Sequence, residues 1–141
     1  MPTSLVLNNL MNTNPPLKPQ KAKGIKRIIK AFFYSKDGLK CAWIEESAFR
    51  QVLILALICI ILASYLAKDF LEWGLLILPC FLSVVIELFN SSIEKAVDYT
   101  GTEFHPLAKK AKDIASSAQL IGLIFWAFIW GRYLLMLYQS N

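Results

Sequence analysis

The stretch LSVVIELFNSSIEKAVDYT, residues 82–100, combines an apolar helical pattern with three polar residues, Glu87, Asn90 and Glu94. It continues a mostly apolar, uncharged run that begins at Trp73, so the whole segment is long enough to cross a membrane. Side chains at positions i, i+3 and i+7 lie on one face of a helix. A carboxylate in hydrocarbon is costly, and such residues usually face a cavity, a partner or a metal. The stretch therefore predicts a spanning helix that carries a functional site.

Two further apolar runs accompany this helix in a chain of 141 residues, which is enough for one domain. Spans are expected at about residues 50–67, 72–98 and 113–138. A soluble three-helix bundle is the alternative, but the third run, LIGLIFWAFIWGRYLLMLY (residues 120–138), is apolar all round. The expected fold class is an all-α membrane protein, with its functional domain over residues 24–141.

The segment before the first span divides into a tail and an amphipathic helix. Residues 1–23 are polar and contain no signal-peptide core, which predicts a disordered cytoplasmic tail. Apolar residues from Ile25 to Phe33 then follow helical spacing opposite a basic face, which predicts an interfacial helix over about residues 24–48. The sequence YSKDG is expected to break or kink this helix at Gly38.

The distribution of basic residues predicts the topology. Lysines and arginines cluster before the first span and in the loop 100–113, whereas the turn KDFLE at 68–72 holds a single lysine. The positive-inside rule therefore predicts a cytoplasmic N-terminus and an outside C-terminus. Anionic lipid accounts for the net charge of +5, so no nucleic-acid partner is expected.

Two other polar groups are candidates for the same site. Glu45 and Glu46 precede the first span, and they are either solvated surface charges or one of them turns toward the second span. The loop after the second span brings Lys112 and Asp113 to the membrane depth expected for Glu94. Carboxylates bind Mg²⁺, Mg²⁺ binds phosphate oxygens, and lysine neutralises the remaining phosphate charge. This inventory predicts phosphoryl transfer at a membrane surface, although no Walker or protein-kinase motif is present.

Two segments resemble a known family. ELFNSSIEKAVDYTGTEFHPLAKKAKDIASSAQL, residues 87–120, resembles the signature of the small bacterial membrane diacylglycerol kinases. GIKRIIKAFFYSKDGLKCAWIEESAFRQ, residues 24–51, resembles their interfacial helix and the start of their first span. The resemblance covers about residues 24–138, and Lys36, Val52 and Phe104 depart from residues frequent in the family. It implies a homotrimer in the bacterial inner membrane that phosphorylates diacylglycerol to phosphatidate with MgATP, at sites shared between subunits.

The resemblance also implies a role for individual residues. Glu87 would take the hydroxyl proton, Asn90 would support the catalytic geometry, and Lys112 would contact the transferring phosphate. Glu46 and Glu94 would hold Mg²⁺. The residues expected to bind ATP are Arg27, Tyr34, Glu46, Glu94, Glu103, Phe104, His105, Lys112 and Asp113. The residues expected at the lipid substrate are Glu87, Arg50 and Trp43, the last of which suits an interfacial depth.

Three other functions compete with this interpretation. Undecaprenol kinase uses related motifs. The sequence EFHPLAKKAKD is more similar to those relatives, whereas the longer AWIEESAFRQ block favours the diacylglycerol enzymes. A small channel or proton-coupled transporter would use Glu87 and Glu94 as relay carboxylates, but the outer half of the second span offers only apolar residues and Pro79 to continue the relay. A non-catalytic scaffold would leave the intramembrane carboxylates unexplained.

Overall fold

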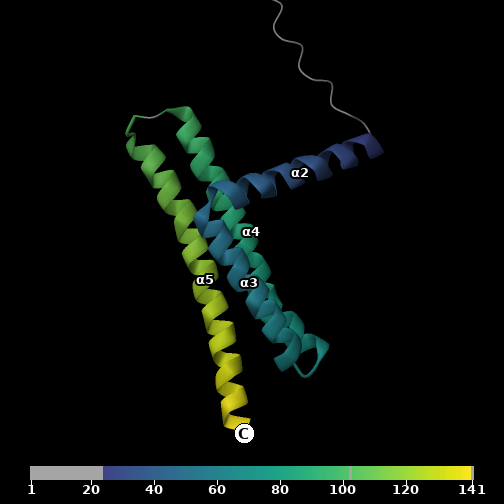
Figure 1. Cartoon of the computed structure of the whole chain (residues 1–141). Helices are drawn as coiled ribbons and strands as arrows, with labels where there is room; N and C mark the ends of the chain where they lie inside the picture. Colours follow the sequence, from purple (N-terminus) through teal and green to yellow (C-terminus); the bar gives the residue numbers. More distant parts are fainter. Residues whose placement is uncertain (1–23, 102, 141) are drawn as a thin grey trace, which may run out of the picture. The chain divides into compact units, whose positions relative to one another are not determined.

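The structure is a computed structural model that describes residues 24–101 and 103–140, and all regular structure in these ranges is helical. Four helices follow in chain order, as Figure 1 shows: α2 (Ile25–Glu45), α3 (Ser47–Leu66), α4 (Phe70–Thr100) and α5 (Pro106–Ser140). Helices α3, α4 and α5 are each long and apolar enough to cross a membrane. The predicted all-α class with three spans is confirmed. The predicted disordered tail lies outside the described residues.

The chain divides into two units, residues 1–36 and 37–141. Helix α2 continues through Gly38, so a break there is excluded, and the alternative of a kink stays a prediction. A glycine inside a helix costs only about 1 kcal/mol relative to alanine, and no proline accompanies it in this helix. The large apolar residues of its first half are each more than half exposed: Ile25, Ile28, Ile29, Phe32 and Phe33. The unit before residue 37 therefore presents an uncovered apolar face beside its basic residues.

The core of the second unit lies where α3, α4 and α5 meet. Its buried residues come from all three helices: Val52, Ala56, Ala63, Leu76, Cys80, Trp126 and Trp130. Alanines on α3 allow the helix backbones to approach closely, as is common between helices in membranes. The Trp130 indole donates a hydrogen bond to the Leu76 carbonyl at 3.0 Å, so this buried N–H group is satisfied. The core fixes α4 between its two neighbours, and α4 carries the polar stripe.

The turn between α3 and α4 is held by a network of polar contacts. Asp69 caps α4 by accepting from the Glu72 backbone N–H at 2.8 Å. The Glu72 carboxylate accepts from the Lys68 N–H at 2.9 Å and lies 3.1 Å from the Tyr133 hydroxyl. That hydroxyl also lies 2.7 Å from the Leu66 carbonyl, which ties α5 to the turn. These contacts stabilise one end of the three-helix unit, opposite the α4–α5 loop (Figure 1).

Candidate active site

The polar stripe of α4 lies on one face of the helix, as its spacing predicts. Glu87 is buried, with 3% of its surface exposed. The Asn90 side-chain amide donates to the Glu94 carboxylate at 3.2 Å, one helical turn further on. The Asn90 Oδ1 atom is buried and has no hydrogen-bond partner. The stripe therefore offers a buried carboxylate, a second carboxylate oriented by an amide, and an amide oxygen available to a further partner.

Glu46 occupies the junction between α2 and α3, where its backbone is extended at φ −106° and ψ 107°. Its N–H donates to the Ala42 carbonyl at 3.0 Å, which ends α2. The Arg50 guanidinium donates to the carbonyls of Trp43 at 2.8 Å and Ile44 at 3.1 Å, two acceptors that the end of α2 leaves free. Arg50 thus stabilises this junction. The contact of Arg50 and Trp43 with lipid substrate stays a prediction.

Lys95 of α4 links the stripe to this junction. Its ammonium lies 2.7 Å from a Glu45 carboxylate oxygen and 2.8 Å from a Glu46 carboxylate oxygen. The Glu46 side chain is the more enclosed of the two, with 23% of its surface exposed against 53% for Glu45. The inward orientation considered for one of these acids is therefore confirmed, and Glu46 is that acid. Hydrogen bonds from Lys95 and then from Cys41, together with the Lys95 charge, lower the pKa of Glu45 below its usual value.

The predicted carboxylates of α4 and of the α2–α3 junction come within electrostatic range of one another. The negative charges of Glu94 and Glu46 both act on Glu87. Such oxygen donors suit Mg²⁺, which proteins usually bind through one or two carboxylates while the remaining ligands are waters and substrate phosphates. Among the described residues, no three acidic, histidine or cysteine side chains are grouped closely enough to hold a metal by themselves. The donor set fits a Mg²⁺ ion that takes other oxygens from water or a phosphate.

Lys112 of α5 pairs with Asp98 of α4 at 2.5 Å, and this contact joins the two helices near their connecting loop. The depth expected for Lys112 was that of Glu94, but its partner lies four residues, about one helical turn, further along α4. Lys112 lies in the second turn of α5, which begins at Pro106 as expected. Asp113 pairs with Lys109 on α5 itself, at 2.5 Å.

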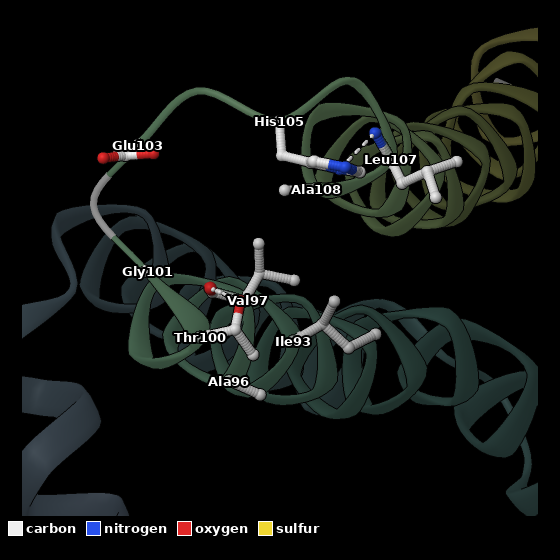
Figure 2. A pocket seen from close by; sticks show the side chains of 9 residues that line it. All are labelled: Ile93, Ala96, Val97, Thr100, Gly101, Glu103, His105, Leu107 and Ala108. Atoms are coloured by element: carbon white, nitrogen blue, oxygen red, sulfur yellow. Dashed lines mark hydrogen bonds between the residues drawn. The ribbon is translucent and has the colours of Figure 1, made fainter.

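An open hollow of about 990 Å³ lies between the end of α4 and the start of α5 (Figure 2). Figure 2 shows Val97 and Ile93 on the α4 side, with His105 facing them from the loop. An adjoining hollow of about 580 Å³ shares Glu103 and His105 with it. Four of the residues expected to bind ATP line this second hollow: Glu103, Phe104, His105 and Lys112. The hollows thus gather acidic, aromatic, imidazole and ammonium groups at one end of the three-helix unit.

His105 has a local structural role as well. Its Nδ1 atom accepts a hydrogen bond from the Leu107 backbone N–H at 3.2 Å, so the imidazole satisfies one free donor at the start of α5. The predicted ATP-binding residues Arg27 and Tyr34 lie at exposed positions of α2, within the unit that ends at Lys36. Their part in the site stays a prediction.

Sequence reasoning missed the role of Lys95. Its partner Glu45 lies 50 residues away in the chain, and no short-range pattern connects them. The pairing of Asp98 with Lys112 had a usable signal, because the two residues flank a short loop between antiparallel helices.

The fold and the site together define an all-helical, multi-pass membrane protein with a carboxylate-rich site at one end of its helices. The family model described as Prokaryotic diacylglycerol kinase matches residues 33–134. A diacylglycerol kinase of Helicobacter pylori strain J99 is 88% identical over 120 residues, covering 85% of this chain and 94% of that protein. The chain belongs to the prokaryotic diacylglycerol kinase family.

Relatives from other bacteria are less similar but cover most of the same chain. A diacylglycerol kinase of Escherichia coli strain K12 is 43% identical over 107 residues, covering 76% of this chain and 88% of that protein. One of Pseudomonas aeruginosa strain PAO1 is 41% identical over 120 residues, covering 85% of this chain and 96% of that protein. The resemblance to this family is confirmed, and the family model covers residues 33–134 of the predicted range 24–138.

Proposed function

We propose that this protein is a lipid kinase that transfers the terminal phosphoryl group of ATP to the primary hydroxyl of diacylglycerol, giving phosphatidate and ADP. Membership of the family and the names of its similar relatives support the substrate. The observation that carries the proposal within this chain is the buried Glu87 carboxylate, on which the charges of Glu94 and Glu46 act, in a three-helix unit whose loop end holds Lys112 in a hollow. A buried acid with acidic neighbours and a phosphate-neutralising cation in the same unit suit phosphoryl transfer better than conduction or anchoring.

The buried Glu87 carboxylate is the proposed general base. The acceptor hydroxyl oxygen forms a bond to the γ-phosphorus, the bond from that phosphorus to the β,γ-bridging oxygen breaks, and Glu87 takes the hydroxyl proton. ADP leaves with the bridging oxygen. The burial of Glu87 suits this role because a carboxylate shielded from water holds a proton more readily than an exposed one.

Glu46 and Glu94 are the proposed ligands of Mg²⁺, and the unpartnered Oδ1 atom of Asn90 lies one helical turn before Glu94. When bound, the ion neutralises charge on the phosphates. The Asn90 amide holds one oxygen of Glu94, which orients that carboxylate as outer-shell partners of metal ligands commonly do. Lys112, released from Asp98, would pair with the transferring phosphoryl group.

The ATP base and ribose are proposed to occupy the hollows at the α4–α5 loop, in contact with Glu103, Phe104 and His105. Asp113 follows Lys112 in the chain. Asp113, Arg27 and Tyr34 are also proposed to contribute to ATP binding. Positioning supplies much of the rate enhancement in phosphoryl transfer, so a small helical protein is sufficient for this chemistry.

The protein is proposed to lie in the bacterial inner membrane with its N-terminus and its α4–α5 loop in the cytoplasm. A homotrimer is proposed because α5 is largely uncovered in one subunit, where only 11% of its most apolar stretch is buried. Part of this surface would face lipid and part would face neighbouring subunits. Cross-linking in membranes, followed by electrophoresis, should give a species with three times the subunit mass.

Replacement of Glu94 by Gln tests the proposal. The variant keeps the size and the hydrogen bond with Asn90 but removes the charge, so MgATP-dependent lipid phosphorylation should fall by about a hundred-fold or more. Asp37→Asn, at an exposed position of α2, is the matched control and should retain activity. Both variants should elute with wild-type protein in size-exclusion chromatography in detergent. Unchanged activity of E94Q would remove Glu94 from the site.

A further inference from the structure

Lys95 holds two adjacent acids with one ammonium group, at 2.7 Å from Glu45 and 2.8 Å from Glu46. The three groups are partly exposed to solvent. The negative charge of Glu46 also acts on the buried Glu87. Lys95 therefore joins a proposed metal ligand to an acid that the reaction does not use.

Glu46 lies where a cation is favoured. Its negative charge and that of Glu94 both act on the buried Glu87. The Lys95 ammonium contacts the Oε1 atom of Glu46, so it neutralises part of this charge. An ammonium and a divalent ion bind carboxylate oxygens by the same attraction, so each weakens the binding of the other at a shared carboxylate.

The ion pair between Lys95 and Glu46 can separate at little cost. Ion pairs between partly exposed side chains contribute little net stability, because water solvates the separated charges well. Glu45 gives the ammonium a second acceptor within reach, so Lys95 stays paired when Glu46 is withdrawn. The Glu45 side chain is the more exposed of the two acids, and it has no metal-directed role in the proposed reaction.

We propose that Lys95 is a placeholder cation for the metal site: it neutralises Glu46 before Mg²⁺ binds and rests on Glu45 alone afterwards. The inference rests on the metal role of Glu46 in the proposed function. Lys95 is then a positioning residue, and Glu45 is the acid that keeps the ammonium when Mg²⁺ displaces it from Glu46. A permanent brace between α4 and the α2–α3 junction is the competing role, and it predicts effects of the opposite sign.

Divalent-ion binding by the full-length protein in detergent, without nucleotide, tests the inference. Mn²⁺ serves as the probe, and its dissociation constant is measured by electron paramagnetic resonance. Lys95→Met should bind Mn²⁺ about five-fold more tightly or better, because the competing charge is gone. Glu45→Gln should bind it more weakly, because the ammonium then has Glu46 as its remaining partner. Lys110→Met, at an exposed position of α5, is the control and should match wild type.

A second measurement tests directly whether Mn²⁺ displaces the Lys95 ammonium from Glu46. A change in Mn²⁺ affinity alone could reflect only the loss of one positive charge. The reactivity of Lys95 toward an amine-specific reagent is followed by mass spectrometry in the wild-type protein, with Lys110 as the internal reference. Reactivity at Lys95 should rise when Mn²⁺ is added, because the ammonium loses one of its two partners. Unchanged reactivity would show a permanent brace and overturn the inference.

The remaining outcomes also decide the matter. Weaker or equal Mn²⁺ binding by K95M overturns the placeholder role, and so does undetectable binding by both wild type and K95M. Glu46→Gln distinguishes this failure from failure of the proposed metal site. If E46Q binds Mn²⁺ as tightly as wild type, Glu46 is not a ligand and the proposed metal role is wrong. If E46Q loses binding while K95M shows no gain, only the placeholder role is wrong.

Discussion

The Lys112 ammonium lies 2.5 Å from the Asp98 carboxylate, and both residues line the smaller hollow beside the α4–α5 loop. The pair spans two helices and is partly exposed, with 37% of the Lys112 side chain and 66% of the Asp98 side chain accessible. Such a pair is held weakly in water, so a phosphate group can take the place of Asp98. A cation is thus already present at the position where the proposed reaction needs one.

Lys112→Met should lower lipid phosphorylation by about a hundred-fold to a thousand-fold, because the transferring phosphoryl group loses its neutralising partner. The matched variant Lys110→Met removes an exposed lysine from the same helix and should leave the rate within about two-fold of wild type. Initial rates at saturating ATP and lipid make the comparison. Equal rates for the two variants would show that Lys112 has only the structural contact with Asp98.

Glu87→Gln should reduce the turnover number by about a hundred-fold to ten-thousand-fold, which is the usual contribution of a general base. Its thermal stability should equal or exceed that of wild type, because a neutral amide is less costly to bury than a charge. Turnover and the midpoint of thermal unfolding in detergent are measured on the same preparation. A variant that keeps more than a tenth of the turnover would exclude Glu87 as the base.

Helix α5 packs closely against α4 at Gly122. A Cβ atom at this position would lie 3.0 Å from the Ile86 side chain and 3.5 Å from the Ser83 hydroxyl, whereas one at Gly131 would meet nothing within 4 Å. Gly122→Leu should therefore destabilise the protein by about 1–3 kcal/mol through overpacking. Gly131→Leu is the control and should be neutral or slightly stabilising, since leucine favours a helix over glycine. Unfolding by sodium dodecyl sulfate in mixed micelles gives both values, and equal stability of the two variants would contradict the close contact.

The tether between Glu45 and Lys95 should weaken in acid. Because the pKa of Glu45 is lowered in the folded protein, its contribution is present above the ordinary carboxyl pKa of about 4.3 and is lost as the pH falls through the lowered value. Wild type should therefore melt above K95M at pH 7, and the difference should shrink below about pH 4. Circular dichroism melting curves of wild type and K95M, recorded at the neutral and the acidic pH, give this difference in melting temperature. A difference that persists undiminished in acid would show that Lys95 stabilises the fold by packing and not by this pair.

The spans and the polar stripe could be predicted from the sequence because both depend on local spacing. The lengths of the apolar runs predicted the three spanning helices, and the i, i+3, i+7 spacing predicted that Glu87, Asn90 and Glu94 share one face. The contact of Lys95 with Glu45 and Glu46 could not be predicted, because it depends on how the α2–α3 junction meets α4. Gly38 misled the helix assignment, since a glycine weakens a helix without ending it unless a cap or a proline follows.

The register between α4 and α5 shows a further limit of sequence reasoning. Lys112 was expected at the membrane depth of Glu94, and its ammonium pairs with Asp98, four residues further along α4. A prediction from membrane depth alone does not identify the contact partner, because the loop geometry and the first turns of α5 determine which residues of the two helices meet. Contacts across a helix pair need the three-dimensional register, whereas a stripe on a single helix does not.

Direct competition between two lipids tests the central claim. Purified protein receives γ-labelled ATP and Mg²⁺ in mixed micelles that contain equal amounts of diacylglycerol and undecaprenol, and the labelled lipids are separated by thin-layer chromatography. The proposed function predicts that nearly all label appears in phosphatidate and that none appears when Mg²⁺ is chelated. Label mainly in undecaprenyl phosphate, or in no lipid at all, would contradict it.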